Sequence, residues 1–204
     1  MLEKLGQDAL IIWATIDPIG TMALFTALTA HLSAENRRRT AYKTVLYAGA
    51  VLLGSIVIGQ LILGAMGIRM ASFQLSGGVI LFLFGLKMIF GSDTPSPRQE
   101  PEHDIAVFPL AIPATATPGA ILAVILLTDN HVHPIPVQIG TALVTIAILG
   151  VTLLLLLMST RIIKLIGVSG ASILTRVMGM ILAAFSVELA MNALGIGQWI
   201  SPPQ

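Results

Sequence analysis

Residues 44–68 read TVLYAGAVLLGSIVIGQLILGAMGI, a stretch without Asp, Glu, Lys or Arg. A helix needs about 20 largely apolar residues to cross the ~30 Å hydrocarbon layer of a membrane, so this stretch is long enough to span it. Three more stretches are free of these residues, and two others contain a single acid, Asp17 or Glu188. The six stretches are 9–30 (Asp17), 44–68, 70–86, 105–128, 137–158 and 177–195 (Glu188). The sequence therefore predicts six transmembrane helices.

Composition supports the same class. Charged residues make up 10% of the 204 residues, against about 25% in soluble domains, and the mean hydropathy is +0.91. A chain this short cannot hide six apolar helices from water, which excludes an ordinary soluble enzyme. A net charge of +1 offers no general attraction for nucleic acid, and the absence of cysteine excludes disulfides and thiolate metal sites. We expect an all-α membrane protein with no cofactor and no bound metal.

Basic residues predict the orientation, because Lys and Arg accumulate in short cytoplasmic loops. Only Lys4 and Arg69 fall on one predicted side. The other nine fall on the opposite side: Arg37, Arg38, Arg39, Lys43, Lys87, Arg98, Arg161, Lys164 and Arg176. This asymmetry predicts that both termini of the multi-pass chain face outward, away from the cytoplasm.

One segment divides the chain nearly in half. Residues 92–104 contain three prolines and four acids, a composition typical of a flexible linker, here on the cytoplasmic side. Residues 1–91 and 105–204 then hold three predicted helices each. We expect them to form a single transmembrane domain over residues 1–204.

The two halves resemble each other at an offset of about 100 residues. Asp17-Pro18-Ile19-Gly20 corresponds to Thr117-Pro118-Gly119-Ala120, and Gly78-Val79-Ile80-Leu81 corresponds to Gly179-Met180-Ile181-Leu182. Because each half has an odd number of crossings, the second copy must be inverted relative to the first. The pattern predicts a 3+3 inverted repeat, a recurring plan of secondary transporters whose substrate site lies at the repeat interface.

Both copies carry a helix interruption. Proline lacks a backbone N–H and suits the first position of a new helix, while Asp17 and Thr117, directly before the prolines, are good N-cap types. We therefore expect helices 1 and 4 to be broken near the membrane midplane. Two half-helix N-termini would meet there, and their N–H groups and dipoles favour an anion such as a carboxylate.

These features predict a site for a small zwitterion, with the carboxylate on backbone N–H groups and the ammonium near Asp17. An intramembrane carboxylate also suits a coupling proton or cation, and Glu188 is a second candidate for coupling or gating. The candidate substrate-binding residues are Asp17, Pro18, Gly20, Thr21, Thr115, Thr117, Pro118 and Gly119. The predicted function is transport of a small neutral amino acid, not enzymatic catalysis, and no oligomeric state is predicted.

Other interpretations stay open. The prolines can produce two kinks without a ligand, and Asp17 can serve only as a helix cap. A channel or a structural membrane subunit fits the same composition. An intramembrane enzyme is less favoured, since the chain has no Cys and no HExxH motif. Asp129, His131 and His133 could bind zinc, but a polar loop cluster of this kind is more often solvated.

Small residues predict close helix packing. Helix 6 places them on one face, and Ser76-Gly77-Gly78 in helix 3 allows close contact with a broken helix. The helix 6 stripe consists of Gly179, Ala183, Ser186, Ala190 and Ala193.

Taken together, these segments resemble the MarC family of six-helix membrane proteins over nearly the whole chain. The resemblance rests on the motif at residues 17–20 with the loop at 35–39, on 76–87, on 109–120 and on 176–184. It implies an inner-membrane protein related to proteins that handle small neutral amino acids such as alanine and glycine, as exporters or exchangers. The sequence differs from the usual family pattern at two positions, with Asp17 in place of Asn and Thr117 in place of Gly.

Overall fold

The computed structural model describes residues 2–91 and 104–196. Every regular element in these two ranges is helical. In chain order the elements are α1 (Leu2–Ile16), α2 (Pro18–Leu28), α3 (Ala34–Ala65), α4 (Met70–Phe90), η1 (Ala106–Thr115), α5 (Pro118–Leu127) and α6 (Ile135–Ala193). The all-α expectation is therefore confirmed for the described part of the chain.

The helices are long and apolar enough for a membrane. The described residues contain five candidate spans, and a sixth is obtained if η1 and α5, which are bent by 54° relative to each other, are counted as one span. Large apolar side chains cover the outer surface, among them Leu46 and Leu61 of α3, Leu83 of α4 and Leu143 of α6. Such a surface would aggregate in water but suits contact with lipid.

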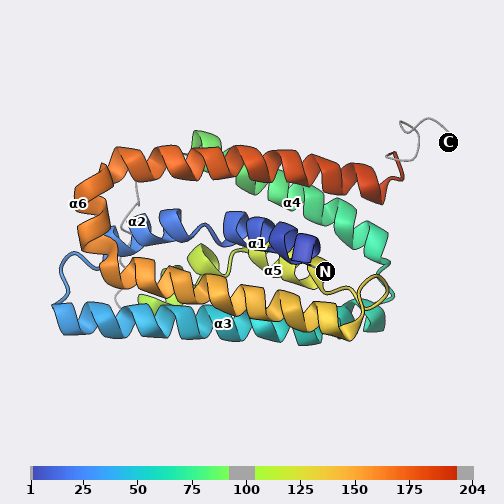
Figure 1. Ribbon diagram of the computed structural model, residues 1–204, viewed down its shortest axis with the longest axis horizontal. Coiled ribbons are helices and arrows are strands. Elements are labelled where there is room, and N and C mark those ends of the chain that lie inside the picture. The colour runs from blue at the N-terminus through green and yellow to red at the C-terminus, as the bar shows by residue number, and fades with distance from the viewer. Residues whose placement is uncertain (1, 92–103, 197–204) are drawn as a thin grey trace.

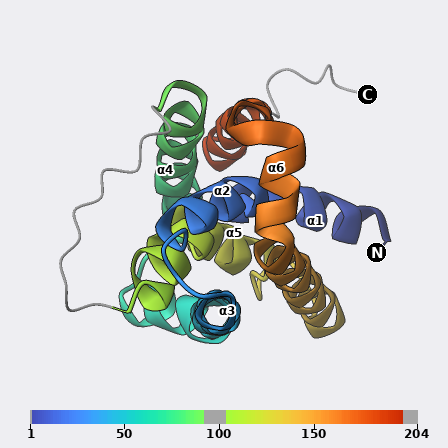
Figure 2. The ribbon, with the colours of Figure 1, turned by 90° about the vertical axis from the view of Figure 1, so that its left-hand side faces the viewer.

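The interrupted helices lie in the middle of the bundle. In Figure 1, α1 and α2 lie between two outer layers. One outer layer consists of α3 and the first part of α6, and the other consists of α4 and the last part of α6. The end-on view in Figure 2 shows the same order, with α5 beside α2. Most of α5 is buried, and its Val124 packs in one apolar cluster with Ile12 of α1, Leu52 of α3 and Leu149 of α6.

The fifth and sixth predicted helices are longer than their apolar stretches. The structure continues α6 from Ile135 to Ala193, with non-helical backbone only at Gly167 (φ 70°) among its described residues. Arg161, Lys164 and Arg176, which the charge pattern assigned to a connection, are helical. Lys and Arg are good helix formers, and glycine adopts positive φ at little cost, so one residue suffices to change direction.

The predicted linker 92–104 lies, except for Asp104, outside the described residues. Asp104 binds Lys43 of α3 at 2.5 Å and accepts a hydrogen bond from the backbone N–H of Ala106. The hydrogen bond from Lys43 lowers the pKa of the Asp104 carboxyl. This contact fixes the start of η1 against the basic end of α3.

Small residues let α4 and the last part of α6 approach closely, which confirms that expectation. A Cβ added at Gly85 of α4 would lie 2.9 Å from the carbonyl oxygen of Gly179, and one at Gly78 would lie 2.9 Å from that of Ser186. Gly77 of α4 faces Leu122 of α5, so α4 also contacts an interrupted span.

The close approach at Gly85 gives a test. Gly85→Ala forces α4 away from α6, and overpacking of this kind costs about 1–3 kcal/mol, which lowers the Tm by about 2–4 °C per kcal/mol in a chain of this size. Gly54→Ala in α3 is the matched control, because among the described residues no other helix lies within 4 Å of its added Cβ. Thermal unfolding of the purified proteins in detergent measures both, and equal Tm values would contradict the packing described.

Candidate functional site

Asp17 separates α1 from α2. Its backbone is left-handed, with φ 47° and ψ 68°, a conformation that Asp and Asn tolerate better than most residues. Pro18 has no N–H to continue the helix and occupies the first position of α2. The Asp17 carboxylate accepts a hydrogen bond from the backbone N–H of Gly20 at 3.1 Å. The residue therefore ends one helix and caps the next.

Gly20 makes this cap possible. A Cβ at this position would overlap the Asp17 carboxylate. Its selection from the sequence as a site residue thus has a local reason, because the carboxylate must fold back over the first turn of α2. Any larger residue at position 20 would push the carboxylate off the helix terminus.

The second interruption lies between η1 and α5. Thr117 caps α5, and its hydroxyl accepts a hydrogen bond from the backbone N–H of Ala120 at 2.8 Å, with Pro118 at the first helical position. The preceding η1 has non-helical backbone at Phe108 and Ile112, each directly before a proline. Residues before proline are biased toward extended backbone, which explains the irregularity.

The two interruptions bind each other. The hydroxyl of Thr117 donates to the backbone carbonyl of Thr15 at 2.8 Å. In the other direction, the hydroxyl of Thr21 donates to the backbone carbonyl of Ala114 at 3.0 Å. Backbone groups freed by a break are costly in an apolar medium, and here each break contributes a hydroxyl that satisfies a carbonyl of the other.

The Asp17 carboxylate is buried without a cation. Its residue is 8% exposed, and within residues 2–91 and 104–196 it forms no ion pair with Lys, Arg or His. The Thr175 side chain of α6 lies beside the carboxylate. A carboxyl group in this position is able to exchange a proton or bind a small cation.

Sequence reasoning missed Thr175. It stands in a helix rich in ordinary apolar residues, next to Arg176, and has no counterpart in the repeat. Thr15 was missed for a different reason. It contributes only a backbone carbonyl, and no residue type signals such a role.

Some of the other candidate residues are buried near the contact between the two breaks, and some lie on the surface. Thr115 is completely buried, but its hydroxyl donates within η1, to the carbonyl of Leu110. Gly119 is buried against Leu81 of α4, whereas Pro118 is exposed. Glu188 is also exposed, and its bond is to Asn192 on the same helix. The structure thus brings Asp17, Thr21 and Thr117 together and leaves Glu188 on the outside.

A second polar cluster lies where α1 meets the start of α6. Asp8 is 1% exposed, forms an ion pair with Lys4 at 2.7 Å and accepts a hydrogen bond from Thr141 at 2.6 Å. Burial, followed by the positive charge of Lys4, lowers the pKa of His133 nearby. Asp129 binds His131 at 3.0 Å, and the described residues contain no group of three metal-ligating side chains.

The hydroxyl of Thr117 allows a direct test of the contact between the breaks. Thr117→Val keeps the shape but removes the bonds to Thr15 and Ala120, at a cost of about 1–3 kcal/mol for each buried group left unsatisfied. Thr152→Val is the matched control, since Thr152 is equally buried but bonds only to a carbonyl of its own helix. Thermal unfolding should show a much lower Tm for Thr117→Val, and equal losses would argue against the contact.

Comparisons with known proteins agree with this membrane architecture. The family described as MarC family integral membrane protein matches residues 2–198. A membrane protein of Buchnera aphidicola from Schizaphis graminum is 31% identical over 198 residues, covering 97% of this chain and 98% of the relative. A membrane protein of Methanocaldococcus jannaschii is 34% identical, covering 90% of this chain and 92% of the relative.

A bacterial relative adds a location. The inner membrane protein YhgN of Escherichia coli is 30% identical over 201 residues, covering 98% of this chain and 99% of the relative. No solved structure matches the chain. Because the match extends over nearly the full length and accords with the apolar helical bundle, the chain belongs to the MarC family of integral membrane proteins.

Proposed function

We propose that this protein is a secondary transporter of small neutral amino acids, such as alanine or glycine, that acts as an exporter or exchanger. The observation that carries the proposal is the Asp17 carboxyl group, which is buried at the N-terminus of α2 and has no cationic partner in the described part of the chain. An uncompensated carboxyl group at such depth is costly and typical of transport pathways.

The same place offers groups for both charges of a zwitterion. The caps use the backbone N–H groups of Gly20 and Ala120. The N–H groups of Ile19 and Gly119 lie one residue earlier, in the first turns of α2 and α5, and are suited to a substrate carboxylate. In the proposal Asp17 and the carbonyls of Thr15 and Ala114 receive the ammonium group.

The contact between the breaks is closed, so transport requires it to open. The bonds from Thr117 to Thr15 and from Thr21 to Ala114 are direct. A substrate that enters would replace them with its own donors and acceptors, so the polar groups stay satisfied throughout. The proposal is for a small substrate because the residues around the second break are small and fully buried: Thr115, Ala116 and Ala120.

The proposed architecture is the 3+3 inverted repeat with halves 1–91 and 105–204, breaks near the midplane and both termini in the periplasm. In this arrangement the outer layers rock around the paired breaks and expose them to one side at a time. Asp17 then carries the coupling proton or cation, and Glu188 contributes to gating at the outer end of α6. The bound partners are the amino acid, the coupling ion and the lipid bilayer.

Transport is tested in proteoliposomes loaded with labelled alanine or glycine. We expect efflux above that of empty liposomes, competition by unlabelled small neutral amino acids, and no hydrolysis or other turnover of the substrate. Flux equal to that of empty liposomes, across several amino acids and under proton and sodium gradients, would contradict the proposal. Ionic current without saturable binding would indicate a channel instead.

The role of Asp17 is tested with Asp17→Asn in the same assay. Asn keeps a side-chain oxygen for the cap on Gly20, so the protein should fold while it loses the titratable group. We expect transport to lose its dependence on the proton or cation gradient. A variant with unchanged pH and ion dependence would exclude Asp17 from coupling, and Glu188→Gln provides the comparison for the second acid.

A further inference from the structure

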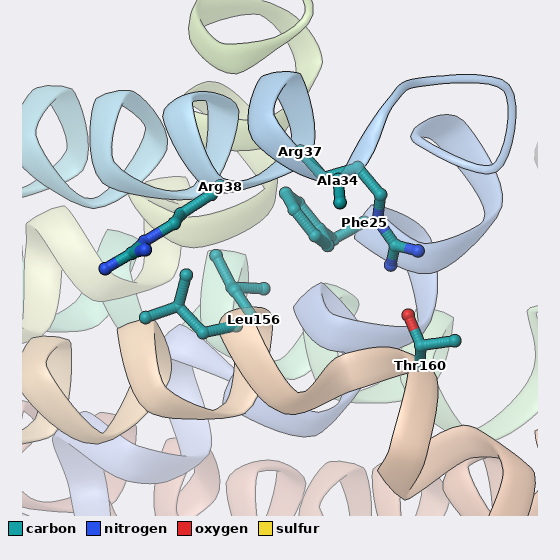
Figure 3. Close-up of a pocket in the computed structure, with 7 residues that line it drawn as sticks. Phe25, Ala34, Arg37, Arg38, Leu156 and Thr160 are labelled. Atoms are coloured by element: carbon teal, nitrogen blue, oxygen red, sulfur yellow. The ribbon is translucent and has the colours of Figure 1, made fainter.

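A cavity of about 360 Å³ opens at the basic end of the bundle, away from the paired breaks. The ends of α2 and α3 and the middle of α6 form its walls (Figure 3). Its lining residues are Phe25, Ala34, Arg37, Arg38, Leu156, Leu157 and Thr160. Two cations thus face a cavity whose other walls are mostly apolar.

Arg37 is held in place but keeps donors free. One of its nitrogens donates to the Ser159 hydroxyl at 3.1 Å, and its guanidinium lies 5.8 Å from the centre of the Phe25 ring. Figure 3 shows the side chain passing Phe25 and pointing toward Thr160. A guanidinium has five N–H donors, so a single bond leaves most of them available to a ligand.

Arg38 lies on the opposite side of the same cavity. Its guanidinium is 5.9 Å from the centre of the Tyr42 ring, which restricts its motion. Among residues 2–91 and 104–196, ion pairs are formed by Lys4, Lys43 and His131, and by neither Arg37 nor Arg38. Two positive charges at one cavity therefore lack an anion in the described part of the protein.

The position of the cavity suggests what the anion is attached to. Phe25, Leu156 and Leu157 belong to the apolar helices, whereas Arg37 and Arg38 stand in the first turns of α3, where the charged residues begin. The cavity therefore crosses the boundary between an apolar layer and a polar one. Basic pockets between transmembrane helices at this level suit lipid head groups.

We propose that this cavity binds a phosphate group, held by Arg37 and the hydroxyl of Thr160 and attracted by the charge of Arg38 across the cavity, with an attached apolar chain along Leu156 and Leu157. Arginine binds phosphate oxygens through its planar fork of donors. The phosphate belongs to an anionic phospholipid or to a soluble phosphate ester. Only the phospholipid has an acyl chain that would lie along Leu156 and Leu157. The proposal does not depend on the transported substrate.

Binding is tested on the full-length purified protein in detergent, by titration with phosphatidylglycerol and phosphatidylcholine and detection of bound lipid by native mass spectrometry. We expect saturable binding of the anionic lipid. Arg37→Gln with Arg38→Gln should weaken it about tenfold or more, the effect of losing charge-assisted hydrogen bonds. Lys164→Gln with Arg176→Gln is the control, since it removes the same charge from exposed positions outside the cavity.

Two single variants, which change the fold less than the double variant, separate loss of binding from misfolding. Arg38→Gln alters an exposed side chain, and Thr160→Val removes only a hydroxyl. Each should weaken binding severalfold while the Tm without lipid stays unchanged. Inorganic phosphate that binds alone and displaces phosphatidylglycerol would assign the site to soluble phosphate compounds, and its failure to compete would assign it to the lipid. Equal binding by the wild type and all cavity variants, or equal binding of both lipids, would overturn the proposal.

Discussion

The structure depends on how backbone polar groups are satisfied where two helices are interrupted inside an apolar bundle. Water is not available there, and each unpaired N–H or carbonyl is costly. Asp17 and Thr117 satisfy N–H groups of the helices that follow them, and the hydroxyls of Thr117 and Thr21 satisfy carbonyls of the opposite break. Among the described residues no buried side-chain nitrogen or oxygen lacks a partner, and two of the buried hydroxyls bind from one break to the other.

The outer helices explain why such a centre can persist. The α3 helix and the first part of α6 cover one side of it, and α4 with the last part of α6 covers the other. Close contact at Gly85 and Gly179 joins the two helices of the second layer, and Thr175 of that layer lies beside Asp17. A movement of this layer would therefore change the surroundings of the Asp17 carboxyl group, which links packing to the proposed alternating exposure of the site.

Composition and charge patterning were sufficient to predict the helical membrane class, because a chain of this length cannot bury so many long charge-free stretches away from water. Asp17 and Thr117 could be singled out because a capping residue before proline is a local signal. The partners of these residues could not be predicted. Thr15 and Ala114 contribute backbone carbonyls, Thr175 lies 158 positions from Asp17 in an unremarkable helix, and Gly167 is one glycine among 19. The helical extension through Arg161 and Arg176 was missed because charge, not helix propensity, decided the predicted boundary.

The paired breaks are tested most directly by cross-linking in native membranes. The chain has no cysteine, so Thr21→Cys with Ala114→Cys gives it only two thiols. The hydroxyl of Thr21 and the carbonyl oxygen of Ala114 are 3.0 Å apart. The bond from Thr117 to Thr15 remains in this variant. The account predicts rapid intramolecular linkage by a short bismaleimide, and much slower linkage for Thr26→Cys with Ala114→Cys, more than one helical turn away on α2. Equal rates for the two pairs, or no linkage of the first pair in folded protein, would contradict it.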